Sequence, residues 1–270
     1  MKILLFLNEG LPSRIAMGPF LERNPDFFHA VAAFPVIPKK ARTGGINWNV
    51  PRRILSGSLA FPFMITIAYF GYVALARILG NDMRQRLWRD GIPMHRFSDA
   101  GSELERYLTE VRPDIVVNCS ATLLGPAILA IPKYGIINYH GAPLPQYRGA
   151  ANQFWMLLAG ERSFRPTLHW MDRGLDTGAI ISQGPEVEIP PGISVFGLWM
   201  QMLEGCSPMM EDLAERLRAE VVPKGHAQDE ALAASRSFPG SADVARIRRA
   251  GHPLLRWADF KAMFRLAITR

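Results

Sequence analysis

The chain is predicted to form an α/β fold built on a mostly parallel β-sheet. Short uncharged runs typical of buried strands alternate with segments whose apolar residues recur at helical spacing. The 270 residues are 49% hydrophobic and 20% charged, as expected for a globular protein with a sizeable core. Polar residues follow two of the apolar runs where each strand would end. Parallel sheets bind their ligands at that edge, so the same edge is the expected place for a functional site.

The first strand is expected at residues 3–7, an apolar run that is too short for a signal peptide. A second buried strand is predicted over 29–37, because Pro38 bounds the run. The remaining strands are predicted at 115–118, 135–140, 165–171, 179–183 and 186–189. Helices are predicted at 12–23, 82–89, 102–110, 123–131, 153–158 and 194–218, the last of them long and rich in methionine.

The net charge of +7 and the pI of about 9.7 favour an anionic partner. Nucleotides, tRNA, folate polyglutamate and acidic lipids all fit this charge, and so does a basic surface that binds nothing. The two cysteines, Cys119 and Cys206, form no metal-binding or redox pattern. We therefore expect no metal site and a reducing cytoplasmic location.

Residues 54–79 include 21 uncharged residues, Ser56 to Ala76, between flanking arginines. By length this segment is a transmembrane candidate. A single span is not expected, because it would separate the first strand from the sheet that it must join. Three alternatives stay open: a helix at a membrane surface, a dimerisation or core helix, and a re-entrant hairpin broken at its proline or glycine. The flanking arginines and tyrosines suit the first, which would make the chain peripheral on the inner face of the membrane.

An amide, an imidazole and a carboxylate come together in the pattern of the sequence. Asn138 and His140 end a predicted strand, and their spacing of two puts both side chains on one face. Asp172 and Asp176 lie in a glycine-containing turn further along the chain. Such a set of groups stabilises an oxyanion and moves a proton. The pattern leaves open which of the two aspartates takes part.

The stretch from about Pro113 to Gln183, roughly a quarter of the chain, resembles the folate-dependent formyltransferases, which include the methionyl-tRNA, glycinamide ribonucleotide and sugar-nucleotide enzymes. The family's motifs occur in its order: Pro132-Lys133-Tyr134-Gly135, Asn138-Tyr139-His140, Leu144-Pro145-Gln146-Tyr147-Arg148-Gly149, Thr167-Leu168-His169 and Asp176-Thr177-Gly178.

The resemblance implies a Rossmann-like core and 10-formyltetrahydrofolate as co-substrate. It gives Asn138, His140 and Asp176 the catalytic positions: the amide and a protonated imidazole would stabilise the developing oxyanion, and the carboxylate would hold the imidazole. It also implies that the pterin lies against the loop Asn118, Cys119, Ser120, Ala121, Thr122, Leu123 and Leu124. Supporting or substrate-contacting roles are implied for Thr167, His169, Tyr147 and Arg148, where Arg148 either clamps an anionic group or anchors its loop.

The sequence also departs from the family. Ala142 and Pro143 stand where relatives often carry a serine, which puts an acceptor contact in doubt. We expect a catalytic domain over 1–205, with an insertion at about 40–80, and a helical, turn-rich C-terminal extension over 206–270. Since methionyl-tRNA formyltransferases carry a C-terminal β-barrel, this short extension makes nucleic acid an unexpected acceptor.

The preferred function is an N-formyltransferase acting on a small, sugar or lipid-linked amine. The alternatives are a methionyl-tRNA formyltransferase-like activity, a formyltetrahydrofolate hydrolase, and a non-catalytic folate-binding protein attached to a membrane. No regulatory domain is recognised before the core, which disfavours the hydrolase. Contact of residues 54–79 with a membrane surface and a homodimer both stay open.

Overall fold

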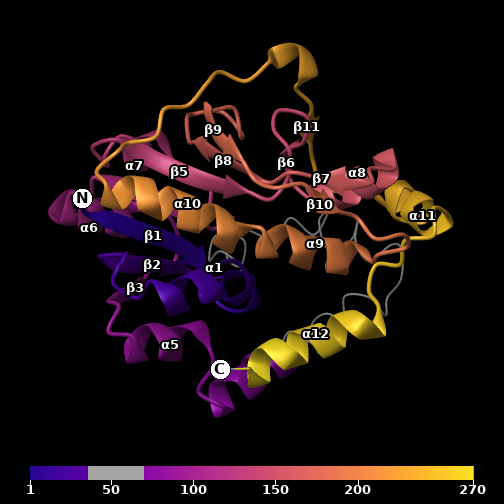
Figure 1. The fold of residues 1–270 in the computed structure, drawn as a ribbon, viewed down its shortest axis with the longest axis horizontal. Coiled ribbons are helices and arrows are strands. Elements are labelled where there is room, and N and C mark those ends of the chain that lie inside the picture. Colours follow the sequence, from indigo (N-terminus) through magenta and orange to yellow (C-terminus); the bar gives the residue numbers. More distant parts are fainter. Residues whose placement is uncertain (36–69, 270) are drawn as a thin grey trace.

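The computed structural model describes residues 1–35 and 70–269. Within these ranges the main sheet has seven strands in the order β3-β2-β1-β4-β5-β8-β9 (Figure 1). Neighbouring strands from β3 to β5 are parallel, whereas β8 and β9 continue the sheet in antiparallel fashion. These strands are β1 (Ile3–Asn8), β2 (Ala30–Phe34), β3 (Met94–Arg96), β4 (Ile115–Cys119), β5 (Gly135–His140), β8 (Thr167–Trp170) and β9 (Ile180–Gln183).

Four short strands form two small sheets beside the main one. β10 pairs with β7 and β11 pairs with β6. Their bounds are β6 (Arg148–Gly149), β7 (Ser163–Phe164), β10 (Val187–Glu188) and β11 (Ser235–Arg236).

The helices are α1 (Leu11–Arg23), α5 (Met83–Arg89), α6 (Ser102–Val111), α7 (Pro126–Leu129), α8 (Asn152–Ala159), α9 (Val195–Glu204), α10 (Cys206–Arg218), α11 (Ser241–Arg249) and α12 (Trp257–Ile268), with a 3-10 turn at Glu230–Leu232. Residues 70–78 form a further helix, called helix 70–78 below.

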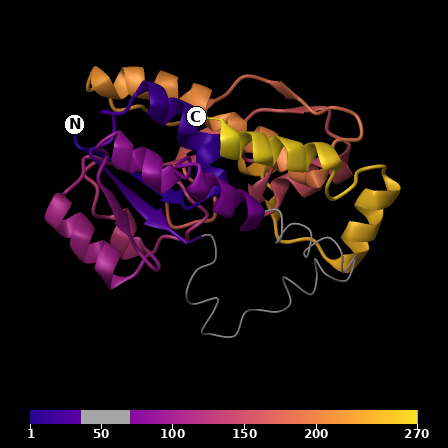
Figure 2. The ribbon, with the colours of Figure 1, turned by 90° about the horizontal axis from the view of Figure 1, so that it is seen from below.

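Helices cover both faces of the sheet because successive side chains of each buried strand point to opposite sides. All six residues of β1 are buried. Leu5 of β1 packs in one cluster with α1, α5 and α10, whereas Phe6 packs in another with α6 and α7. Figure 2 shows α1 and α10 on one side of the strands and α6 on the other. The amphipathic helix α6 buries Leu104 and Leu108, which are one turn apart.

The structure confirms the predicted α/β fold and its mostly parallel sheet. The predicted helix 194–218 is wrong as a single helix, since it breaks at Gly205 into α9 and α10. A Cβ on Gly205 would lie 2.9 Å from the hydroxyl of Tyr139, so the chain there needs a glycine. Pro208 has no N–H to donate to the preceding turn, which also opposes a continuous helix.

Two smaller expectations also differ. The helix predicted at 123–131 is only α7, preceded by an irregular loop. The short strands at 179–183 and 186–189, expected to pair with each other, are present as β9 and β10 but belong to different sheets. The edge strand β3 was not predicted, because two of its three residues are exposed polar side chains.

The predicted boundary between 205 and 206 falls between α9 and α10. Met210 and Leu213 of α10 lie in the same buried cluster as β1 and α1. The side chains of α10 therefore help to cover the face of the sheet that carries α1.

Most of the apolar segment at 54–79 lies outside the described residues. The described part, helix 70–78, buries Tyr72 and Ala76 against α1, α9 and α12. Only Tyr72 and Ala76 of residues 70–78 are buried, so this part of the segment packs as a surface helix with one inward side. Among the described helices, none combines the length and the apolar character that a bilayer span requires.

Candidate active site

The carboxyl end of β5 delivers Asn138 and His140 to one face of the sheet. Both side chains are buried, although both are polar. β5 lies where the sheet changes direction, with the parallel β4 on one side and the antiparallel β8 on the other. Across the antiparallel pair, Asn138 lies opposite His169, and His140 lies opposite Thr167. The pairing therefore brings the two predicted motifs into one site.

Asn138 is fixed by hydrogen bonds on both sides of its amide. Its Oδ1 accepts from Asn118 Nδ2 at 2.7 Å, and its Nδ2 lies 3.0 Å from His169 Nε2. His169 Nδ1 donates to the Trp170 carbonyl at 2.9 Å, so in the neutral ring Nε2 accepts from Asn138. Burial, and then the neighbouring His140, lower the pKa of His169, which favours this neutral form.

His140 is held by the backbone of its own loop. Its Nε2 donates to the Tyr147 carbonyl at 2.7 Å, because a carbonyl oxygen can only accept. Asn152 Nδ2 lies 3.2 Å from the same nitrogen and donates to the Gly149 carbonyl. The other ring nitrogen, Nδ1, is 3.7 Å from Asp176 Oδ2. A proton on Nδ1 would thus lie on the side of the ring that faces the carboxylate.

The carboxylate of Asp176 lies between the two imidazoles. Its Oδ1 is 3.8 Å from His169 Nε2, and its Oδ2 accepts from the Gly149 N–H at 2.8 Å. Asp176 has a left-handed backbone with φ of 55°, a conformation that aspartate adopts more readily than most residues. Asp172 instead accepts from Thr177 Oγ1 and from the Gly174 N–H within its own turn. Of the two aspartates that the sequence left open, Asp176 is the one that faces His140.

The predicted pterin loop begins at the end of β4. Asn118 Oδ1 accepts from Ser120 Oγ at 2.7 Å, and Asn8 Oδ1 accepts from the Ala121 N–H at 2.7 Å. The loop side chains after Asn118 are partly or fully exposed, and Leu123 is 82% exposed. Cys119, at the end of β4, has its sulfur 3.7 Å from that of Cys206 on α10. The loop therefore joins a buried amide pair to an exposed apolar side chain.

The other predicted residues hold the loop that follows β5. Thr167 Oγ1 donates to the Ala142 carbonyl, and Tyr147 donates its hydroxyl proton to Glu161. Arg148 is buried and its guanidinium binds Gln228 and Glu230. Of the two alternatives for Arg148, the geometry corresponds to the anchor of its loop.

Sequence reasoning missed two groups that shape the site. Gln228 donates its amide protons to the carbonyls of Asp176 and Gly178, at 2.8 and 2.7 Å, and so holds the turn that carries the carboxylate. It lies about fifty positions after that turn in a stretch without a motif. Gly149 belongs to a recognised motif, but its function as an N–H donor to Asp176 has no signal in the sequence. Its φ of 95° and its approach to the Arg236 carbonyl explain why a glycine stands there.

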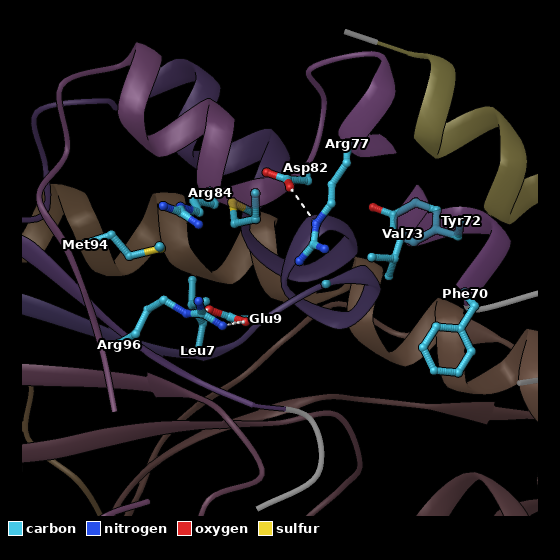
Figure 3. A pocket seen from close by; sticks show the side chains of 12 residues that line it. Leu7, Glu9, Phe70, Tyr72, Val73, Arg77, Asp82, Arg84, Met94 and Arg96 are labelled. Atoms are coloured by element: carbon cyan, nitrogen blue, oxygen red, sulfur yellow. Dashed lines mark hydrogen bonds and ion pairs between the residues drawn. The ribbon is translucent and has the colours of Figure 1, made fainter. Parts of the chain in front are cut away.

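A cavity of about 300 Å³ lies near the carboxyl ends of β1 and β3 (Figure 3). Arg77 Nε is 3.4 Å from Asp82 Oδ2, and Arg96 pairs with Glu9. Apolar side chains complete its lining: Leu7, Phe70, Tyr72, Val73, Met83 and Met94. Asn138 and His140 do not line this cavity, which belongs to the opposite half of the sheet.

Residues 81–197 match the family described as formyl transferase. The methionyl-tRNA formyltransferase of Acidobacterium capsulatum is 34% identical over 161 residues, which cover 58% of this chain and 51% of that protein. The chain spans about half or less of the length of the first curated relatives that it matches.

Two solved structures are similar over most of the chain. The N-formyltransferase from Helicobacter canadensis, in complex with folinic acid and dTDP-3-aminofucose, has a TM-score of 0.55 at 16% identity and covers 93% of this chain and 81% of its own. Glycinamide ribonucleotide transformylase 1 from Symbiobacterium toebii has a TM-score of 0.54 at 19% identity, with 84% and 93% covered. At these identities the likeness shows the fold.

Proposed function

We propose, from the match of residues 81–197 to the formyl transferase family, that this chain transfers a formyl group from 10-formyltetrahydrofolate to an amine. The observation that carries the proposal is the arrangement at the end of β5. An amide held from both sides, an imidazole and a carboxylate converge there, with His140 Nδ1 directed toward Asp176. These groups suit a reaction in which negative charge builds on an oxygen while an amine loses a proton.

The folate would supply the formyl carbon that the acceptor amine attacks. The bond from that carbon to N10 would then break, and N10 of the released tetrahydrofolate would take up the proton that the amine loses. Asn138 has two amide protons, of which one is directed to His169, so the second is suited to the formyl oxygen. A proton on His140 Nδ1 would serve the same oxygen, since 3.7 Å is too long for a direct hydrogen bond to Asp176. Asp176 would stabilise the charged imidazole and take the proton of the amine through a water molecule.

The loop after β4 fits a flat heteroaromatic ring. The buried pair of Asn118 and Asn138 offers polar groups, and Leu123, five positions further along the loop, offers an exposed apolar side chain. Folinic acid is bound in the similar enzyme from Helicobacter canadensis, which supports a folate as co-substrate. In our proposal residues 118–124 hold the pterin, mainly through backbone groups.

For the acceptor we propose a small, sugar or lipid-linked amine rather than a tRNA. Support comes from the amino-sugar nucleotide in the same complex. A methionyl-tRNA acceptor and release of formate to water are the alternatives.

The unlinked thiols of Cys119 and Cys206 agree with a reaction in the reducing cytoplasm.

The direct test follows the release of tetrahydrofolate from 10-formyltetrahydrofolate in the presence of single amines. Release that requires an amine supports transfer, and release in its absence supports hydrolysis. Tight folate binding without release would contradict both enzymatic functions. His140→Ala should lower kcat by at least about a hundredfold, about 3 kcal/mol in transition-state stabilisation. The matched control is His95→Ala, at an exposed histidine on β3, which should keep full activity.

A further inference from the structure

Large apolar side chains are exposed together on three helices of the described structure. Seven of the 13 that the described residues expose lie on helix 70–78, the turn after it, α5 and α12. Of these seven, the most exposed are Trp88, Ile78 and Trp257, at 81%, 81% and 72%. Exposed large apolar side chains gathered on neighbouring helices are typical of an interaction site. We call it the outer helical surface: Phe70, Ile78, Leu79, Trp88, Trp257, Phe264 and Ile268.

The three helices are held together by two hydrogen bonds and a ring contact. Asn81 donates to the Ala267 carbonyl of α12, and Arg86 of α5 donates to the Thr269 carbonyl. The ring of Phe264 lies 3.5 Å from the place where a Cβ on Gly71 would be, which puts this ring against helix 70–78. In Figure 1, α12 ends beside this helix at the end of the molecule opposite β11.

The exposed side of α12 combines apolar side chains with a cation. Trp257, Lys261, Phe264 and Ile268 follow at intervals of three and four residues, so they share one stripe, and all are exposed. The inner side buries Met263 and Ala267. The outward stripe thus carries aromatic and aliphatic side chains interrupted by a cation, rather than the polar residues of a solvated helix.

The same helices carry exposed cations. Arg77, Arg84, Arg89, Lys261 and Arg265 are exposed on these helices. Among the acidic residues of these helices and their connections, Asp82 pairs with Arg77, Asp259 is buried and bonded to Ser194, and Asp90 is exposed. These helices therefore expose apolar side chains together with more cations than anions.

We propose that the outer helical surface binds the headgroup region of an anionic lipid membrane. Tryptophan and phenylalanine prefer that region, and arginine and lysine are attracted to anionic lipids. A second copy of the chain is a poorer occupant, because it would bring two positively charged surfaces together. The proposal does not depend on formyl transfer, since the surface and the end of β5 share no residue.

The test uses the full chain and vesicles of two compositions, phosphatidylcholine alone and phosphatidylcholine mixed with phosphatidylglycerol. The protein should sediment with the mixed vesicles, and salt should weaken this binding. Lys261→Gln and Arg265→Gln should each weaken binding by about fivefold. The triple variant Trp257→Ser, Phe264→Ser and Ile268→Ser should weaken it by more than tenfold.

The matched control changes three exposed apolar residues outside this surface, Val221→Ser, Leu232→Ser and Phe238→Ser, and should bind like the unchanged chain. The rate of formyl transfer in solution should be the same in all variants, and only the α12 triple variant, which loses the contact of Phe264 with helix 70–78, should melt at a lower temperature. Sedimentation with neither vesicle, or binding that the α12 triple variant leaves unchanged, overturns the proposal. So does a dimer that this variant dissociates in a chain that does not bind vesicles.

Discussion

Asp176→Asn isolates the charge that we propose to act on His140. Asparagine keeps the shape of the side chain, tolerates the left-handed φ of 55°, and retains an oxygen that can accept from the Gly149 N–H. What it removes is a negative charge 3.7 Å from His140 Nδ1, in a side chain only 15% exposed. At an effective dielectric constant of about 20, a unit charge at that distance contributes about 4 kcal/mol to the stabilisation of a positive charge that develops on the ring in the transition state. We therefore expect kcat to fall by about a thousandfold.

Single-turnover release of tetrahydrofolate at saturating substrate measures this loss without the contribution of product release. Asp172→Asn is the matched control, because Asp172 accepts two hydrogen bonds inside its own turn and does not pair with an imidazole. It should cost less than about tenfold. An Asp176→Asn variant that keeps a tenth of the activity, or one that loses no more than Asp172→Asn, would refute the electrostatic function given to this carboxylate.

Three further predictions concern the supports of the site. Because burial lowers the pKa of His169, the unfolded chain binds its proton first as the pH falls below about 6.5. The free energy of unfolding should therefore decrease on acidification more steeply than in His169→Gln, as measured by urea titration at several pH values. Gly149→Ala should destabilise by about 2 kcal/mol or more, since its Cβ would lie 2.2 Å from the Arg236 carbonyl oxygen, whereas Gly251→Ala, left-handed but in open space, should cost less in the same titration. Gln228→Ala should lower kcat by about tenfold, because it releases the turn of Asp176, and it should also lower the melting temperature, because the buried Arg148 loses an acceptor.

The part of the site on β5 could be predicted because it depends on local pattern. A buried apolar run predicted the strand, and the period of two put Asn138 and His140 on one face. The function of Asp176 came from the resemblance, and the choice over Asp172 needed the structure. Both carboxylates lie in the same short turn, and only the backbone conformation decides which of them reaches the imidazole.

The long-range supports could not be predicted. Gln228 lies in an irregular loop, whose path cannot be predicted from a periodic pattern of apolar residues. It binds backbone carbonyls, which every residue type has, so the residue types at the contact give no sign of it. The same holds for α10. Its spacing of Met210, Leu213 and Leu217 indicates a helix with one apolar side, but not that this side covers the sheet beside α1.

The antiparallel pairing of β5 with β8 limits where residues can be inserted or deleted in this region. Asn138 meets His169, and His140 meets Thr167, only in one register. Inserting or deleting a single residue between the two strands could be absorbed by the connecting loop. A one-residue change inside β8 would keep the backbone ladder but turn His169 to the opposite face, away from Asn138. Among sequences with this fold, insertions and deletions should therefore occur in the connection and be absent from the four residues of β8, whose register sets the position of His169 in the site.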